Sequence, residues 1–163
     1  MHLRMGLGNL MNEVTLNQVF DRLFVGDWLM GAGLVAYNPH KVTAVLCVHQ
    51  ENSYKKDPNI IYALIPFDDG HEIPERQFKE CLSWLKFMYE NGHNILIHCA
   101  AGRSRSVTIT AAFMHYAGLA TFEEALQMIA LARPEASNPH PAVVVSAKKM
   151  LKIWPYCEDA FKE

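Results

Sequence analysis

The sequence predicts a single α/β domain in which a central, mostly parallel sheet is flanked by helices. Three observations lead to this expectation. Short apolar runs rich in β-branched residues alternate with segments of helical periodicity, as in parallel sheets that are covered on both faces. The chain has 163 residues, which is the size of one domain. Half of its residues are hydrophobic and a fifth are charged, as expected for an ordinary buried core.

Four runs have the composition of buried strands. They are short, apolar and rich in valine, isoleucine and leucine. We expect these strands at residues 22–26 (RLFVG), 42–48 (VTAVLCV), 60–65 (IIYALI) and 94–98 (NILIH). Between the first two, residues 27–38 are apolar but include Gly31 and Gly33, so only a short helix is expected there.

Two helices are expected on either side of the fourth strand. Pro74 suits a first helical position, apolar residues then recur at helical spacing, and Asn91 with Gly92 supplies a stop. Residues 104–117 are apolar nearly all round and are followed by Gly118. A helix that is apolar on every side should lie at the centre of the domain.

Two further helices are expected toward the end of the chain. Thr121 and Glu124 form a capping box, and the apolar stripe that follows stops at Arg133 and Pro134. The last helix is expected over residues 141–153. No internal repeat and no linker interrupts the pattern, which favours one domain.

Composition and charge exclude several classes of protein. With 15 basic and 17 acidic residues the net charge is -2, so no nucleic-acid partner is expected. No apolar run is long enough to span a membrane, and residues 1–14 lack the pattern of a signal or transit peptide. We therefore expect a cytoplasmic protein, and a monomer.

The cysteines show neither paired spacing nor clustering with histidine. They are Cys47, Cys81, Cys99 and Cys157. Neither a disulfide framework nor a metal site is expected from this distribution, and no cofactor is predicted. Cys81 and Cys157 are interpreted as packing or surface thiols.

The most informative stretch is HCAAGRSRS at residues 98–106, between a buried strand and an apolar helix. A loop in this position directs backbone N–H groups and the positive end of the helix dipole into one concavity, which suits a phosphate group. Gly102 permits a tight turn, and the small alanines leave the backbone accessible. The residues expected to bind phosphate are Ala100, Ala101, Gly102, Arg103 and Ser104.

Cys99 is the expected nucleophile. A cysteine thiol is mostly protonated at neutral pH, but a helix N-terminus and nearby cations favour the thiolate. A thiolate here would attack phosphorus and form a phosphocysteine, which splits one difficult displacement into two easier steps. Arg105 can grip two phosphate oxygens with its planar guanidinium, which a lysine cannot match. In supporting roles, Ser106 would donate to the departing sulfur and His98 would hold the loop.

HCAAGRSRS fits the HCxxGxxR[ST] signature, and the chain resembles the cysteine-based protein tyrosine phosphatase superfamily, above all its small dual-specificity branch. The resemblance extends over roughly residues 17–154. It implies a protein tyrosine phosphatase-like fold, with an N-terminal extension at 1–16 and a catalytic domain at 17–163. It also implies that the substrate is a phosphoprotein or phosphopeptide. The short chain leaves no room for the loops that build a deep phosphotyrosine pocket, so phosphotyrosine and phosphoserine or phosphothreonine are all expected substrates.

The general acid is expected after the third strand, in the segment IPFDDG. Cleavage of a phosphate ester needs a proton for the departing oxygen, and Asp68 and Asp69 are the candidates. The family pattern places its acid about thirty residues before the cysteine and three after a proline, which from Pro66 counts to Asp69. Asp69 is our choice and Asp68 the alternative, although these residues also suit a simple turn.

Other functions stay open. The same loop chemistry could act on a phosphoinositide or on the 5′ end of an RNA, although inositide-directed relatives commonly carry a basic residue where this chain has Ala100. An inactive module that binds phosphoproteins is a second alternative, against which the intact Cys99 and Arg105 argue. A rhodanese-like or arsenate-reducing enzyme is a third, and the glycine and Arg-Ser pair of the loop fit it less well.

The resemblance adds two weaker expectations. Cys47 aligns with a cysteine that some relatives oxidise onto their nucleophile, although a buried strand cysteine is the simpler interpretation. Asn138 is expected to hydrogen-bond to the phosphate loop.

Overall fold

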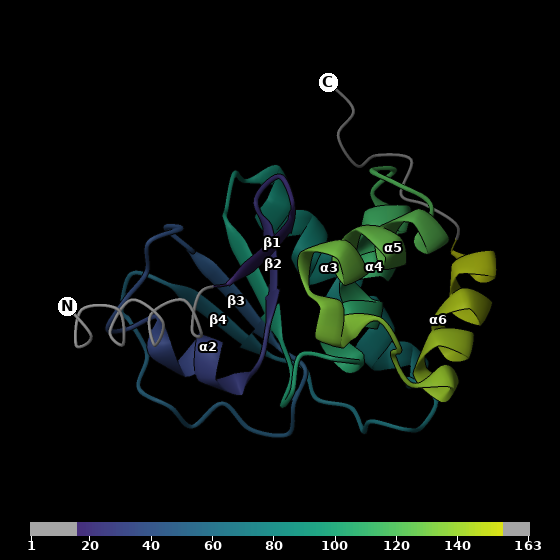
Figure 1. Cartoon of the computed structure of the whole chain (residues 1–163), viewed down its shortest axis with the longest axis horizontal. Coiled ribbons are helices and arrows are strands. Elements are labelled where there is room, and N and C mark those ends of the chain that lie inside the picture. Colours follow the sequence, from purple (N-terminus) through teal and green to yellow (C-terminus); the bar gives the residue numbers. More distant parts are fainter. Residues whose placement is uncertain (1–15, 155–163) are drawn as a thin grey trace.

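The computed structural model describes residues 16–154. These residues form a five-stranded sheet with helices on both of its faces (Figure 1). The strands are β1 Asn17–Phe20, β2 Leu23–Gly26, β3 Ala44–Cys47, β4 Ile61–Leu64 and β5 Ile95–His98. Their order is β1-β2-β5-β3-β4, with β2, β5, β3 and β4 parallel and β1 antiparallel to β2. The mostly parallel sheet and its four predicted strands are confirmed.

The helices match the sequence pattern closely. They are α2 Trp28–Gly33, α3 Glu75–Glu90, α4 Arg105–Tyr116, α5 Phe122–Ala132 and α6 Pro141–Ile153, with a short 3-10 helix, η1, at Pro134–Ala136. Pro74 lies just before α3 rather than in its first turn. Thr121 caps α5 by accepting from the N–H of Glu124 at 3.1 Å. The glycine after α4, Gly118, has a φ of 74°, as expected for a helix stop.

Strand β1 is not predicted from the sequence. Asn17 and Gln18 are polar, so the run lacks the apolar signal of the other strands. It forms because a tight turn brings it back beside β2, with Arg22 in the turn at a φ of 59°. The strand contributes Val19 to the core.

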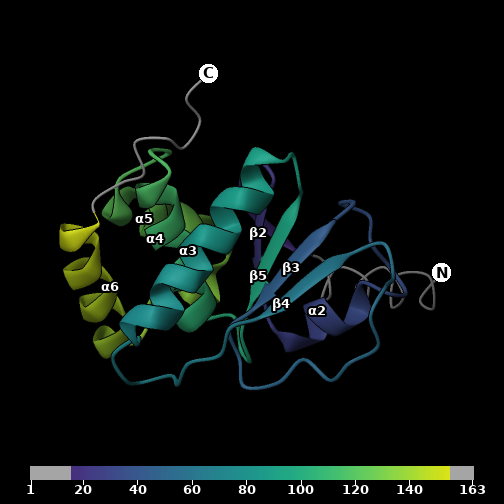
Figure 2. The same cartoon turned by 180° about the vertical axis from the view of Figure 1, so that it is seen from behind.

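Successive strand residues pack on opposite faces of the sheet, and two cores result. Val25, Leu46 and Ile97 belong to the larger core, which is shared with α3, α4, α5 and α6. Phe24, Val45 and Leu96 belong to the smaller core, which α2 covers with Met30. Figure 2 shows this division, with α2 and the long helices on opposite sides of the sheet. Cys81 is buried in the larger core, in agreement with its interpretation as a packing residue.

The parallel register brings three strand ends together. His98 at the end of β5 is paired with Gly26 at the end of β2 and with Cys47 at the end of β3. Ligand sites of open α/β sheets form at the carboxyl ends of strands such as these. The loop after β5 therefore leaves the sheet at the position where a site is expected.

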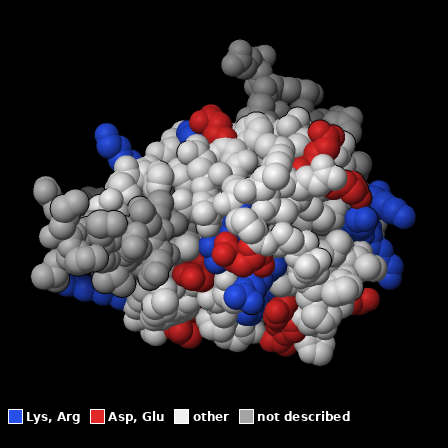
Figure 3. Space-filling view, viewed as in Figure 1, with Lys and Arg blue, Asp and Glu red and all other residues white. Residues whose placement is uncertain are grey.

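Within residues 16–154, no helix combines the length and the apolarity needed to cross a bilayer. Cys157 and the predicted N-terminal extension, apart from Leu16, lie outside the described residues. In Figure 3 basic and acidic side chains are interspersed on the face shown, and neither sign of charge dominates it.

Candidate active site

Cys99 follows β5 directly, and its sulfur has two hydrogen-bond partners. The backbone N–H of Gly102 donates to Sγ at 3.3 Å. The hydroxyl of Ser106, in the first turn of α4, lies 3.2 Å from the same sulfur. The side chain is buried, with 3% of its surface exposed. A thiolate can only accept hydrogen bonds, so both partners would donate to the sulfur in that form, and the geometry suits a nucleophilic thiolate.

Gly102 sets the shape of the loop. Its φ is 66°, in the left-handed region that favours glycine. A Cβ at this position would lie 2.6 Å from the carbonyl oxygen of Gly26, which is rigid backbone. The loop therefore rests against the end of β2. On the same side, the N–H of Trp28 donates to the carbonyl of Ala100 at 3.0 Å.

Arg105 is the first residue of α4, and the two terminal nitrogens of its guanidinium are hydrogen-bonded to the segments that follow β3 and β4. Nη1 donates to Oε1 of Gln50 at 2.9 Å and to the carbonyl of Phe67 at 3.1 Å. Nη2 donates to Nδ1 of His49 at 3.3 Å. Nε is buried and has no hydrogen-bond partner among the described residues. Because a buried unpaired donor is costly, this N–H is suited to an anionic ligand.

The side chain of His98 supports the loop by binding the backbone of Cys99. Since a carbonyl can only accept, Nδ1 of His98 donates to the carbonyl of Cys99, at 3.1 Å. The other ring nitrogen then accepts from the hydroxyl of Tyr54, at 2.7 Å. Burial lowers the pKa of His98, which favours this neutral form, and burial likewise raises the pKa of Tyr54. His98 is thus a positioning residue.

Arg133 also holds the loop, from behind. Its Nε donates to the carbonyl of Gly102 at 2.8 Å, and Nη2 donates to the carbonyl of Ala101 at 3.0 Å. Nη1 donates to Oδ1 of Asn17 in β1 at 2.8 Å. These bonds keep two loop carbonyls directed away from the side that an anion would occupy. Sequence reasoning treats Arg133 only as the end of a helix, and no local signal distinguishes it from a surface arginine.

The two candidate acids have different surroundings. Asp68 accepts a hydrogen bond from Nε2 of Gln50 at 2.6 Å. Asp69 is exposed and makes no hydrogen bond or ion pair with any described residue. Gly70 follows with a φ of 78°, so the predicted turn is present. The segment lies beside Arg105, because that guanidinium also binds the carbonyl of Phe67.

Two residues of the loop have contrasting roles. Arg103 is exposed, whereas Ser104 is buried and its hydroxyl accepts from the backbone N–H of His140 at 2.9 Å. The hydrogen bond expected from Asn138 is not found within the described residues. His140, two positions later, ties this segment to the loop instead.

Cys47 lies near the site but is not activated. Its sulfur lies 3.7 Å from the carbonyl of His49 and 3.5 Å from the carbonyl of Glu51. Burial raises the pKa of Cys47 to about 11. The thiol form therefore prevails at neutral pH.

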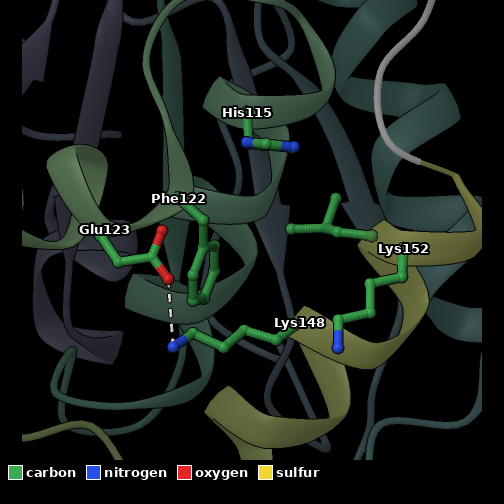
Figure 4. A pocket seen from close by; sticks show the side chains of 6 residues that line it. His115, Phe122, Glu123, Lys148 and Lys152 are labelled. Atoms are coloured by element: carbon green, nitrogen blue, oxygen red, sulfur yellow. Dashed lines mark ion pairs between the residues drawn. The ribbon is translucent and has the colours of Figure 1, made fainter.

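A second hollow, of about 370 Å³, lies at the other end of α4 (Figure 4). It is lined by His115, Phe122, Glu123, Lys148, Leu151 and Lys152, and an ion pair of 3.0 Å joins Glu123 to Lys148. His115 is ten residues beyond Arg105, or about 15 Å along a helix. None of the predicted site residues lines this hollow.

Comparison with known proteins finds a matching family model, similar sequences and similar folds. Residues 23–146 match the family model described as dual specificity phosphatase, catalytic domain. Dual specificity protein phosphatase 15 of Homo sapiens is 35% identical over 125 residues, which cover 76% of this chain and 41% of the relative. The Mus musculus protein of the same name is 34% identical over 128 residues, covering 77% and 53%. The chain thus spans about half the length of the curated relatives it matches.

Solved structures share the fold. The crystal structure of DUSP15 has a TM-score of 0.73 and 29% identity, and the match covers 83% of this chain and 86% of that chain. A mouse putative dual specificity phosphatase complexed with zinc tungstate has a TM-score of 0.76 at 20% identity, covering 88% and 93%. The expected protein tyrosine phosphatase-like fold is confirmed.

Proposed function

Because the chain belongs to the dual specificity phosphatase family, we propose that it hydrolyses phosphate monoesters of phosphoproteins through a phosphocysteine at Cys99. Phosphotyrosine and phosphoserine or phosphothreonine are the proposed substrates. The observation that carries the proposal is the pairing of two groups. The sulfur of Cys99 accepts from the N–H of Gly102 and lies 3.2 Å from the hydroxyl of Ser106. Arg105, which begins the helix after the loop, has a buried Nε–H without a hydrogen-bond partner among the described residues.

In the first step the Cys99 thiolate attacks phosphorus, and the bond between phosphorus and the ester oxygen breaks. Asp69 gives its proton to that oxygen, so the substrate leaves as a neutral hydroxyl. Arg105 and the backbone N–H groups of the loop bind the phosphoryl oxygens, on which charge is concentrated in the transition state. The product of this step is a phosphocysteine.

In the second step water attacks the phosphocysteine and Asp69 takes up one of its protons. The bond between sulfur and phosphorus breaks, and inorganic phosphate is released. The hydroxyl of Ser106 donates to the departing sulfur, which supports its leaving as a thiolate. Every protein group used in the two steps comes from this chain, so the proposed chemistry needs no second copy. We propose that the enzyme is a monomer and that it acts in the cytoplasm.

The test is hydrolysis of phenyl phosphate, an aryl phosphate whose leaving group needs a proton, by the wild type and by Cys99→Ser, Arg105→Lys and Asp69→Asn. We expect the first two variants to lose turnover and the third to lose at least about a hundredfold. Arg76→Lys, on the exposed face of α3, is the matched control for Arg105→Lys and should be unaffected. A wild type that binds phosphopeptides without hydrolysing them would instead identify a binding module.

The substrate class needs a separate comparison. Release of phosphate is measured from a phosphopeptide panel, a phosphoinositide panel and a 5′-phosphorylated RNA. Preference for the peptides supports the proposal. Preference for either other panel would contradict it, while leaving the phosphocysteine chemistry intact.

A further inference from the structure

Gln50 is bonded at both ends of its side-chain amide. Oε1 accepts from Nη1 of Arg105 at 2.9 Å, and Nε2 donates to Oδ1 of Asp68 at 2.6 Å. The orientation of the amide is fixed by chemistry, because a guanidinium only donates and a carboxylate only accepts. One side chain thus links the segment after β3 to the segment after β4 and to the start of α4.

A second bond reinforces this link. Nη1 of Arg105 also donates to the carbonyl of Phe67, the residue just before Asp68. Arg105 and Phe67 are buried, whereas Gln50 and Asp68 are exposed. The segment carrying the candidate acids is therefore attached to the guanidinium twice, once by its backbone and once through Gln50 at the solvent edge.

The same contacts separate the two aspartates. One oxygen of Asp68 is occupied by Gln50, while Asp69 makes no hydrogen bond or ion pair with a described residue. Because the two residues are adjacent, holding Asp68 limits where the Asp69 carboxyl group can lie. Asp68 thus has the contacts of an anchor, and Asp69 is left to meet the leaving group.

We propose that Gln50 is a positioning residue that couples the phosphate grip of Arg105 to the placement of the general acid. The inference rests on the proposed function. It predicts a specific defect: loss of Gln50 impairs proton delivery far more than phosphate binding or attack by sulfur. Only a side chain with both an acceptor and a donor can do this, so glutamate is not an adequate replacement.

The test uses two substrates that differ in their need for a proton. A nitrophenyl phosphate has a leaving group that departs readily as an anion, whereas phenyl phosphate depends on the general acid. Gln50→Glu keeps an acceptor for Arg105 but loses the donor and puts a like charge opposite Asp68. We expect its kcat to fall about tenfold for phenyl phosphate and less than about twofold for nitrophenyl phosphate.

A double variant separates this role from simple loss of structure. In Gln50→Glu combined with Asp68→Asn, the donor and acceptor are exchanged, because the asparagine amide can donate to the glutamate. We expect most of the lost kcat for phenyl phosphate to return, which is a coupling that additive damage would not produce. Gln127→Glu, an exposed glutamine on α5, is the control for the same chemical change elsewhere.

Two results would overturn the inference. One is a Gln50→Glu variant with equal losses on both substrates or none. The other is a double variant that is no better than Gln50→Glu. If the wild type hydrolyses neither substrate, the proposed function itself fails, so the two failures are distinguishable.

Discussion

At the scale of single residues, the site depends on side chains that act on the backbone of the loop. His98 binds the carbonyl of Cys99, and Arg133 binds the carbonyls of Ala101 and Gly102. Because those carbonyls are held outward, the N–H groups of the loop remain available to an anion. A substitution behind the loop should therefore affect phosphate binding without touching phosphate.

Arg133→Lys tests this role. The lysine keeps the charge but cannot bind two carbonyls with one planar group, so the loop should lose its fixed shape. We expect the inhibition constant of inorganic phosphate to rise about tenfold and the free energy of unfolding to fall by about 1–3 kcal/mol. Steady-state inhibition and urea denaturation measure these two quantities. An unchanged inhibition constant in a destabilised variant would reduce Arg133 to a purely structural role.

His98 gives stability a pH dependence. Burial lowers its pKa below 6.5, so the unfolded chain binds a proton more readily than the folded chain. The contribution of neutral His98 to the free energy of unfolding is present in full above pH 6.5. It is lost as the pH falls toward the lowered pKa of the folded state, by at most about 1.4 kcal/mol per pH unit. Urea denaturation from pH 7.5 to 5 should show this loss, and His98→Gln should reduce it. If the variant does not fold, NMR titration of the wild type should find the pKa of His98 below the ordinary value for histidine.

Cys47 should be a slow partner for an oxidised Cys99. A pKa raised to about 11 leaves little thiolate at neutral pH, and only the thiolate attacks sulfur readily. After mild peroxide, we expect mass spectrometry to find Cys99 oxidised without a link to Cys47. Rapid and complete formation of the Cys47–Cys99 disulfide would contradict this interpretation.

At the scale of elements, the loop between β5 and α4 has its shape because two backbones touch. Gly102 adopts a left-handed φ and lies against the carbonyl of Gly26. The strand, the helix and the turn are each readable in the sequence. Their contact with the end of β2 is not, since it depends on the order of strands in the sheet.

Gly102→Ala should disable the loop. Left-handed strain costs about 1–3 kcal/mol, and the added Cβ would also meet the carbonyl of Gly26. We expect kcat to fall by at least about a hundredfold, while the circular dichroism spectrum stays unchanged. Gly33→Ala in α2 is the matched control, because a Cβ there would meet no atom of residues 16–154 within 4 Å. That variant should stay active and be up to about 1 kcal/mol more stable.

Prediction from sequence succeeded where the signal was local. The four apolar strands, the capped helices and the HCAAGRSRS loop all carry their evidence in consecutive residues. It failed for β1, whose polar residues form a strand only through pairing with β2. It also missed Tyr54, Gln50 and Arg133, because the contacts that give these residues their roles join distant segments.

At the scale of the whole molecule, one sheet separates two cores of unequal size. The strands β2, β3 and β5 each contribute alternate residues to both cores, so neither core can open without disturbing strands that the other needs. Surface ion pairs such as Arg76–Glu80 are exposed and add little. Stability therefore resides in this shared sheet.

Unfolding should remain a single transition whichever of the two cores is destabilised. We expect Leu82→Ala in the larger core and Leu34→Ala in the smaller core each to cost about 2–5 kcal/mol. For both variants, circular dichroism and tryptophan fluorescence should give the same urea midpoint. Separate midpoints in the Leu34→Ala variant would indicate that the layer under α2 melts independently.

The bond between Arg133 and Asn17 has a practical consequence for work on this protein. The side chain of Arg133 joins Asn17 in the first strand to the carbonyls of Ala101 and Gly102 in the loop proposed to bind phosphate. A change that displaces the first strand should therefore also shift the loop, and an N-terminal affinity tag or fluorescent fusion is one such change to control for. Assays should compare an N-terminally tagged preparation with one from which the tag has been cleaved.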